Sequence, residues 1–257
     1  MKNYIKVITN IFIASISLSV LLGSLLRFLG PINQNNQINR RINIVGKSLR
    51  SNKKKSLRKK SDLLLLYNNN SQKFQRLEIL IKKWESLISK NKDLEVSCYL
   101  FSLDNKYYAE INQEIKLPAA SSIKVPILII LLTMLDKEEI SWDEKLILTE
   151  DTVGGGSGWM AYQKIGNEFP IYEVASEMIR VSDNTATNLL IKRIGGISTI
   201  NQKFKEIGLQ NTQINNLLPD LDGTNLTTTK DLSLGMALVD SGYLLNVSSR
   251  DIFREIM

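Results

Sequence analysis

Two short motifs in this sequence carry side chains that could perform acyl transfer. In the first, "PAASSIKVPILIILL", Ser121 and Lys124 stand three residues apart at the head of an apolar run that reads as a helix. A spacing of i and i+3 would bring the serine hydroxyl and the lysine amine to one helix face. A lysine that burial keeps neutral can take the proton of a serine hydroxyl. The alternative is a helix N-cap serine followed by a lysine whose ammonium reaches solvent.

The second motif is Ser182-Asp183-Asn184, in "RVSDNTATNLLIKRIGG", at the expected start of an amphipathic helix. Ser182 could relay a proton to a leaving group, and Asn184 could donate its amide to a substrate carbonyl. We expect Asp183 to cap the helix and brace the turn. Taken alone, this motif is explained equally well as an ordinary helix N-cap.

The composition excludes several catalytic classes. The 257 residues include no histidine and one cysteine, which rules out a Ser-His-Asp triad, a Cys-His pair and histidine metal sites. The net charge of +7 is unevenly placed, because residues 1–60 hold 13 of the 33 Lys and Arg and none of the 26 Asp and Glu. The basic residues of the segment 31–60 have no aromatic residues between them, so we expect no binding to nucleic acid.

Three regions follow from the distribution of apolar and charged residues. Residues 1–30 include the apolar stretch 7–26, which is long enough to cross a bilayer as an uncleaved signal anchor. Residues 31–70 predict a basic, polar tether, either a solvated spacer or a contact with anionic lipid or cell-wall polymer. Residues 71–257 predict one globular domain. We expect this domain to face the periplasm or cell envelope; the loop charges do not determine the orientation, and the oligomeric state stays open.

Within the globular region, hydrophobic periodicity predicts a hairpin followed by helices. Apolar residues from Phe74 to Leu87 recur at helical spacing, and "EVSCYLFSLDNKYYAEINQ" predicts two strands around a turn at Asp104-Asn105. Thr228 begins a capping box and therefore a helix. The other predicted helices lie near residues 121–136, 171–181, 184–194 and 197–207.

Together, the Ser121-x-x-Lys124 and Ser182-Asp183-Asn184 motifs, with the "IGG" that follows, resemble the penicillin-recognising serine hydrolases, specifically the class A β-lactamase branch. The resemblance covers roughly residues 72–257. It implies an α+β, serine β-lactamase/D,D-peptidase-like fold, with an antiparallel sheet and flanking helices beside an all-helical lobe. It also implies that Ser121 is the nucleophile, Lys124 its base, Ser182 the proton relay and Asn184 a substrate donor. The implied ligand is a β-lactam or a peptidoglycan stem peptide, without a cofactor or metal.

This sequence departs from the class A pattern in the segment "LPDLDGTN", residues 218–225. Class A β-lactamases place a glutamate there that activates the deacylating water, and this chain has Leu218 instead. Leucine cannot accept a proton, so we expect acylation to proceed and release of the acyl group to stall. This leucine is similar to that of a cyanobacterial penicillin-binding group allied to class A enzymes. Asp220 or Asp222 is an alternative base.

The family's K-T-G strand is the second departure, because the sequence contains no K-T-G and the motif would fall beyond Met257. The resemblance therefore implies a catalytic domain that is incomplete at its C-terminus. Three hypotheses stay open: a slowly deacylating penicillin-binding protein or D,D-carboxypeptidase, a working class A β-lactamase, and a non-catalytic membrane-anchored protein that binds cell wall. Trp159 is either a wall of the substrate site or a packed loop residue.

Overall fold

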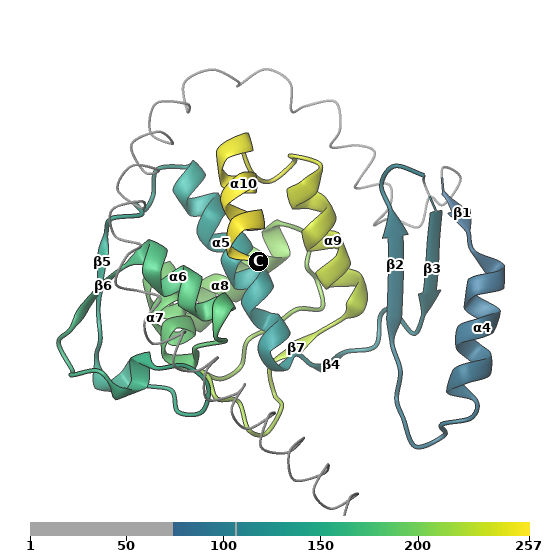
Figure 1. Ribbon diagram of the computed structural model, residues 1–257, viewed down its shortest axis with the longest axis horizontal. Coiled ribbons are helices and arrows are strands. Elements are labelled where there is room, and N and C mark those ends of the chain that lie inside the picture. Colours follow the sequence, from purple (N-terminus) through teal and green to yellow (C-terminus); the bar gives the residue numbers. More distant parts are fainter. Residues whose placement is uncertain (1–73, 106) are drawn as a thin grey trace, which may run out of the picture. The chain divides into compact units, whose positions relative to one another are not determined.

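The computed structural model describes residues 74–105 and 107–257. The predicted anchor at residues 7–26 and the tether at 31–70 lie outside the described residues and stay predictions. Within the part of the chain that the structure describes, no helix combines the length and the apolar character that a membrane span requires. The described residues form three small sheets and a group of helices (Figure 1).

Most of the helices surround one central helix, α5 (Lys124–Asp136). Every side chain from Ile127 to Leu132 is at most 1% exposed, which is the behaviour of a helix that is apolar on all sides. Five helices contact α5, and Figure 1 labels them around it: α6 (Ile171–Arg180), α7 (Asn184–Ile194), α8 (Gly196–Glu206), α9 (Thr229–Asp240) and α10 (Val247–Ile256). The core of the helical region is therefore α5, and residues at its N-terminus are held on several sides.

The helices predicted after residue 120 are confirmed to within three residues at their ends. The Thr228 hydroxyl accepts a hydrogen bond from the Asp231 N–H at 3.0 Å, so the predicted cap of α9 is present. Gly195, at φ +115°, ends α7 and allows α8 to begin at the next residue. The sequence analysis did not predict α10, which Asn246 caps by accepting from the Ser249 N–H.

The predicted hairpin is confirmed as strands β2 (Cys98–Ser102) and β3 (Tyr107–Ile111), which pair antiparallel with Leu100 opposite Ala109. A two-residue strand, β1 (Gln75–Arg76), lies parallel to β3 on its other edge, giving the order β1-β3-β2. The antiparallel pairing that was predicted is confirmed for β2 and β3, and β1 adds a short parallel strand. Helix α4 (Glu78–Ile88) packs against β3, and β2 packs against α9.

The first predicted helix begins later than its apolar pattern indicates. Helical spacing was predicted from Phe74, but the helix starts at Glu78, and Leu87 on its expected apolar face is 59% exposed. Phe74 instead packs against Phe101 of β2, with ring centroids 5.4 Å apart. The Leu77 N–H bonds to the Tyr108 carbonyl at 2.8 Å. Pairing with a neighbouring strand thus overrides the helical periodicity of these first residues.

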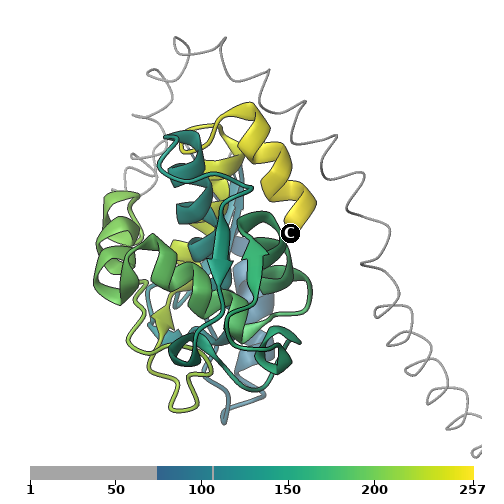
Figure 2. The same ribbon diagram turned by 90° about the vertical axis from the view of Figure 1, so that its left-hand side faces the viewer.

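Two further strand pairs are present, and one of them directly precedes the segment that carries Ser121. Strand β4 (Leu117–Pro118) pairs with β7 (Leu226–Thr227), and β5 (Lys145–Ile147) pairs with β6 (Glu168–Pro170). The β5–β6 pair runs beside α6 and α7 and faces the viewer in Figure 2. Three short 3-10 helices complete the region: η4 (Ala120–Ile123), η5 (Glu150–Thr152) and η6 (Met160–Tyr162).

Candidate active site

Ser121 lies in the 3-10 turn η4, immediately before α5, and not within the α-helix that the sequence predicted. The reason is Pro126, the third residue of α5, which has no N–H to bond to the Ser122 carbonyl. The turn before Lys124 tightens to a 3-10 helix, a common geometry at helix starts. Ser121 remains exposed, whereas Lys124 is 2% exposed.

The Lys124 amine lies at the meeting point of both sequence motifs. Its Nζ is 3.4 Å from the Ser121 Oγ, 2.8 Å from the Ser182 Oγ, 2.7 Å from the Ser182 carbonyl oxygen and 3.0 Å from the Asn184 Oδ1. The two serine hydroxyls also bond to each other at 2.8 Å. Lys124 therefore points inward, and the alternative of a lysine that reaches solvent is wrong.

The chemistry of these four contacts decides what a neutral amine would do. The Ser182 carbonyl and the Asn184 Oδ1 can only accept hydrogen bonds, so they take the two N–H bonds of an unprotonated amine. Its lone pair is then left for the hydroxyl side of the site. Ser182 Oγ is 2.8 Å from both Lys124 Nζ and Ser121 Oγ, so a proton can pass between them through this hydroxyl as well as directly.

Burial lowers the pKa of Lys124 from 10.5 to about 8, and the negative charge of Asp183 partly opposes this effect. Removing an ammonium from water disfavours its charged form, which is the dominant cause. At pH 7 about one amine in ten is then neutral, against about one in three thousand for a lysine of ordinary pKa. A general base that works near neutral pH needs a pKa in this range.

The Ser182-Asp183-Asn184 turn has an unusual backbone. Ser182 has a φ of +57°, in the left-handed region that non-glycine residues seldom adopt. Asp183 is fully buried and caps α7, because its Oδ1 accepts from the Ala186 N–H at 2.9 Å. The turn aims the Ser182 hydroxyl and carbonyl at Lys124, which a continuous helix could not do.

A glycine-rich loop closes over this turn. The Asn184 side chain donates to the Gly155 carbonyl at 2.8 Å, and its backbone N–H donates to the Ser157 carbonyl at 3.1 Å. Gly155 takes one of the two N–H bonds of the Asn184 amide. The other is the one that a ligand carbonyl could use.

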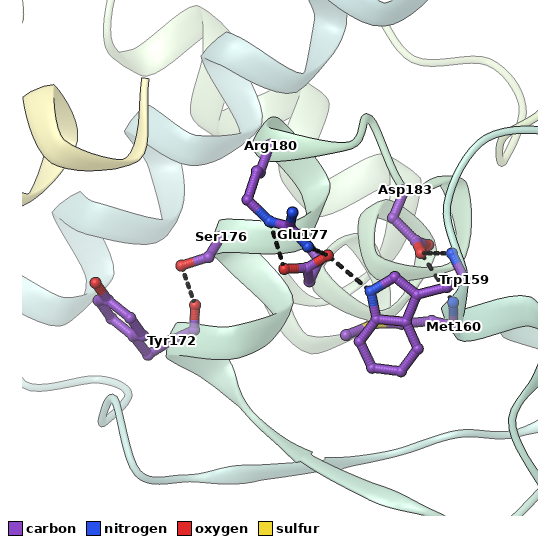
Figure 3. A network of polar contacts seen from close by, with 7 residues as sticks. All are labelled: Trp159, Met160, Tyr172, Ser176, Glu177, Arg180 and Asp183. Atoms are coloured by element: carbon purple, nitrogen blue, oxygen red, sulfur yellow. Dashed lines mark hydrogen bonds and ion pairs between the residues drawn. The ribbon is translucent and has the colours of Figure 1, made fainter. Parts of the chain in front are cut away.

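Trp159 of this loop is packed and hydrogen-bonded. Its indole N–H donates to Glu177 at 2.7 Å, and its ring meets Phe169 edge to face at a centroid distance of 5.8 Å. Figure 3 shows the Trp159 indole directed at the Glu177 carboxylate, from a loop that also bonds to Asp183. These contacts favour the packed-loop interpretation of Trp159.

The sequence analysis missed several residues that assemble the site. Asn188, one turn into α7, clamps the Leu218 backbone by accepting from its N–H at 2.8 Å and donating to its carbonyl at 2.7 Å. Gly154 packs so closely that a β-carbon there would lie 2.4 Å from the Leu218 carbonyl oxygen and 3.2 Å from the Asn184 Cβ. The sequence did carry one signal for Asn188: the run of polar residues in "SDNTATN" falls on a buried helix, where polar side chains need hydrogen-bond partners.

Neither aspartate near Leu218 has the environment of a general base. Partial burial works against ionisation of Asp220, but hydrogen bonds from the Asn225 N–H and the Thr224 hydroxyl outweigh it and lower its pKa. Asp220 Oδ2 accepts from the Asn225 N–H at 2.6 Å, and Asp220 Oδ1 accepts from the Thr224 hydroxyl at 2.8 Å. Asp220 therefore braces its own loop. Asp222 is exposed.

Comparison with known proteins gives a consistent result. Residues 79–257 match a family model described as "Beta-lactamase enzyme family". The solved structure of PBP-A is 38% identical, with a TM-score of 0.70 over 72% of this chain and 69% of that chain. A leucine-to-glutamate variant of PBP-A, an acyl-enzyme complex with penicillin G, is also 38% identical, with a TM-score of 0.70 over 71% of this chain and 69% of that one.

A curated relative matches over a shorter stretch. β-Lactamase BRO-1 of Moraxella catarrhalis is 34% identical over 100 residues, which are 38% of this chain and 32% of that protein. The matched part thus spans about a third of the length of this curated relative. The two structures of PBP-A carry the comparison over most of the described residues.

Proposed function

This chain belongs to the beta-lactamase enzyme family, and we propose that within it the chain is a penicillin-binding acyl-transfer protein that releases its acyl group slowly. Ser121 is the nucleophile, Lys124 its base, Ser182 the proton relay and Asn184 a donor to the substrate. The ligand is a β-lactam or a peptide ending in D-Ala-D-Ala. The observation that supports this most strongly is the 2.8 Å spacing of the Ser182 hydroxyl from both Ser121 Oγ and Lys124 Nζ.

Acylation begins when neutral Lys124 accepts the Ser121 proton, directly or through Ser182. The Ser121 Oγ then forms a bond to the carbonyl carbon of the β-lactam, and the Ser121 backbone N–H faces the developing oxyanion. As the bond from the carbonyl carbon to the ring nitrogen breaks, Ser182 gives its hydroxyl proton to that nitrogen. Lys124 returns its proton to Ser182, which leaves a Ser121 ester and a neutral amine.

Release of the acyl group needs a water molecule and a base to activate it. The Leu218 side chain is buried at 7% exposure and offers no proton acceptor. Loss of a positioned general base typically slows a step by about 10²- to 10⁴-fold. With Asp220 committed to its own loop, the ester is expected to persist, which is the behaviour of a penicillin-binding protein.

Labelling with a fluorescent penicillin tests this proposal. The 257-residue chain should retain the label through denaturing electrophoresis, and Ser121→Ala should abolish it. Ser122→Ala is the matched control, because the neighbouring Ser122 hydroxyl donates to the Ala119 carbonyl and should leave labelling intact. Absence of label on the unmodified chain contradicts the proposal and favours the non-catalytic hypothesis. Rapid loss of label together with nitrocefin hydrolysis contradicts slow release and favours a working β-lactamase.

A further inference from the structure

A buried carboxylate next to the site has no part in the acylation steps described above. Glu177, in the last turns of α6, is 8% exposed. Its Oε2 accepts from the Trp159 indole and from Arg180 Nη2, both at 2.7 Å, and its Oε1 accepts from Arg180 Nε at 2.9 Å (Figure 3). A carboxylate is costly to bury unless it is paired. These contacts meet that requirement, and they also tie Trp159 to α6.

Trp159 belongs to the loop that closes over the catalytic turn. Its backbone N–H and that of Met160 donate to Asp183 Oδ2, at 2.8 and 2.9 Å. The backbone carbonyl of Glu177 accepts from the Asp183 N–H at 3.1 Å. The Glu177 carboxylate therefore bonds to the loop through Trp159, and the Glu177 backbone carbonyl bonds to the turn through Asp183. The loop and the turn also bond to each other directly, through Asp183 and Asn184, and Glu177 adds a tie from α6 to both segments.

The turn needs such support because its backbone is strained. A non-glycine residue in the left-handed region, as Ser182 is, is sterically disfavoured and persists only where the surroundings enforce it. If the loop moved away, Ser182 would relax toward a commoner backbone conformation. The Ser182 carbonyl and hydroxyl would then leave the Lys124 amine, which they now approach at 2.7 and 2.8 Å.

We propose that Glu177 is a positioning residue: through the Trp159 indole, it clamps the glycine-rich loop onto the Ser182-Asp183-Asn184 turn and so keeps Ser182 and Asn184 against Lys124. The inference rests on the proposed acylation of Ser121. Glu177 acts through Trp159, not on the ligand.

Glu177→Gln and Trp159→Phe test the clamp. Glutamine keeps one oxygen that can accept from the Trp159 indole, but its NH2 faces an Arg180 N–H and it loses the charge pairing that holds that oxygen in place. Phenylalanine keeps the ring packing but loses the indole N–H. Each variant should slow the first-order step of Ser121 acylation by penicillin about tenfold, with little change in the initial binding constant. The double variant should be no slower than the slower single variant, because both changes break one contact chain.

The pH profile separates positioning from a general loss of stability. The groups that face the Lys124 amine are Ser121, Ser182, Asn184 and the nearby charge of Asp183. Once the turn loosens, water reaches the ammonium, and the acidic limb of the acylation profile should move to higher pH. A variant that only destabilises the fold, assayed well below its melting temperature, would leave that limb in place.

Two matched controls are available. Glu173→Gln changes a half-buried carboxylate one helical turn earlier on α6, where burial and the charge of Glu177 raise the pKa of Glu173. Trp142→Phe changes an indole whose ring packs edge to face on Tyr172. Both controls should acylate at the rate of the unmodified chain.

The outcomes are distinguishable. Acylation by Glu177→Gln at the control rate, or additive losses in the double variant, overturns the inference. If the unmodified chain takes no label, the proposed function fails. Hydrogen exchange then still tests the clamp, since Glu177→Gln should speed exchange of the Trp159, Met160 and Asp183 amides relative to Glu173→Gln. Unchanged exchange overturns it.

Discussion

The buried amine of Lys124 should make the stability of the fold depend on pH in a window set by two pKa values. In the folded chain the pKa is about 8, and in the unfolded chain it returns to about 10.5. Below pH 8 both states carry the ammonium, and the fold bears the full cost of burying it. Between pH 8 and pH 10.5 the unfolded state binds more protons, so the free energy of unfolding rises with pH.

The size of this effect follows from the drop in pKa. A tenfold change in an equilibrium corresponds to about 1.4 kcal/mol, so the drop from 10.5 to about 8 amounts to about 3 kcal/mol. Lys124→Met removes the titrating group and keeps an unbranched side chain of similar length. The free energy of unfolding of the unmodified chain should rise by about 2 kcal/mol more than that of Lys124→Met between pH 7.5 and pH 10, so the difference, variant minus unmodified chain, should fall by that amount.

Urea unfolding at a series of pH values measures that difference, and other titrating groups cancel in it. Lys205→Met, at an exposed position on α8, controls for the change of lysine to methionine. A difference that stays flat for Lys124→Met from pH 7.5 to pH 10 would refute a buried amine of lowered pKa. The same result would remove the base from the proposed mechanism, whose acylation rate should rise with pH and level off above about pH 8.

Three further changes probe the surroundings of the site. Leu218→Glu should shorten the lifetime of the Ser121 ester by roughly 100-fold or more, measured as loss of penicillin label; an unchanged lifetime would count against the alignment of this segment with the family's glutamate. Gly158→Ala should destabilise the chain by about 2 kcal/mol or more in urea unfolding, because its β-carbon would lie 2.1 Å from the Asp183 carboxylate; normal stability would mean that this loop is not held as described. Asp220→Asn should cost roughly 1 kcal/mol at pH 7 and leave ester release unchanged. Since the folded pKa of Asp220 lies below 3.8, that cost should disappear as the pH falls below about 4, and slower ester release would identify Asp220 as a base instead.

Much of the local structure of this protein was determined by short stretches of sequence. The apolar run after Lys124 predicted a buried helix, the capping box at Thr228 placed the start of α9, and the Asp104-Asn105 turn placed the hairpin. These features depend on hydrogen bonds and side-chain periodicity within a few residues of each other. They can therefore be predicted without knowing what the segment packs against.

Only the tertiary structure decided how the site is assembled. Ser121 and Ser182 are 61 positions apart, and their 2.8 Å contact exists because α5 packs against α7. The burial that lowers the pKa of Lys124, and the link from Glu177 to Trp159, likewise come from helices and loops distant in sequence. The motifs indicated the candidate reacting groups, but desolvation and alignment are properties of the packed core, to which residues all along the domain contribute.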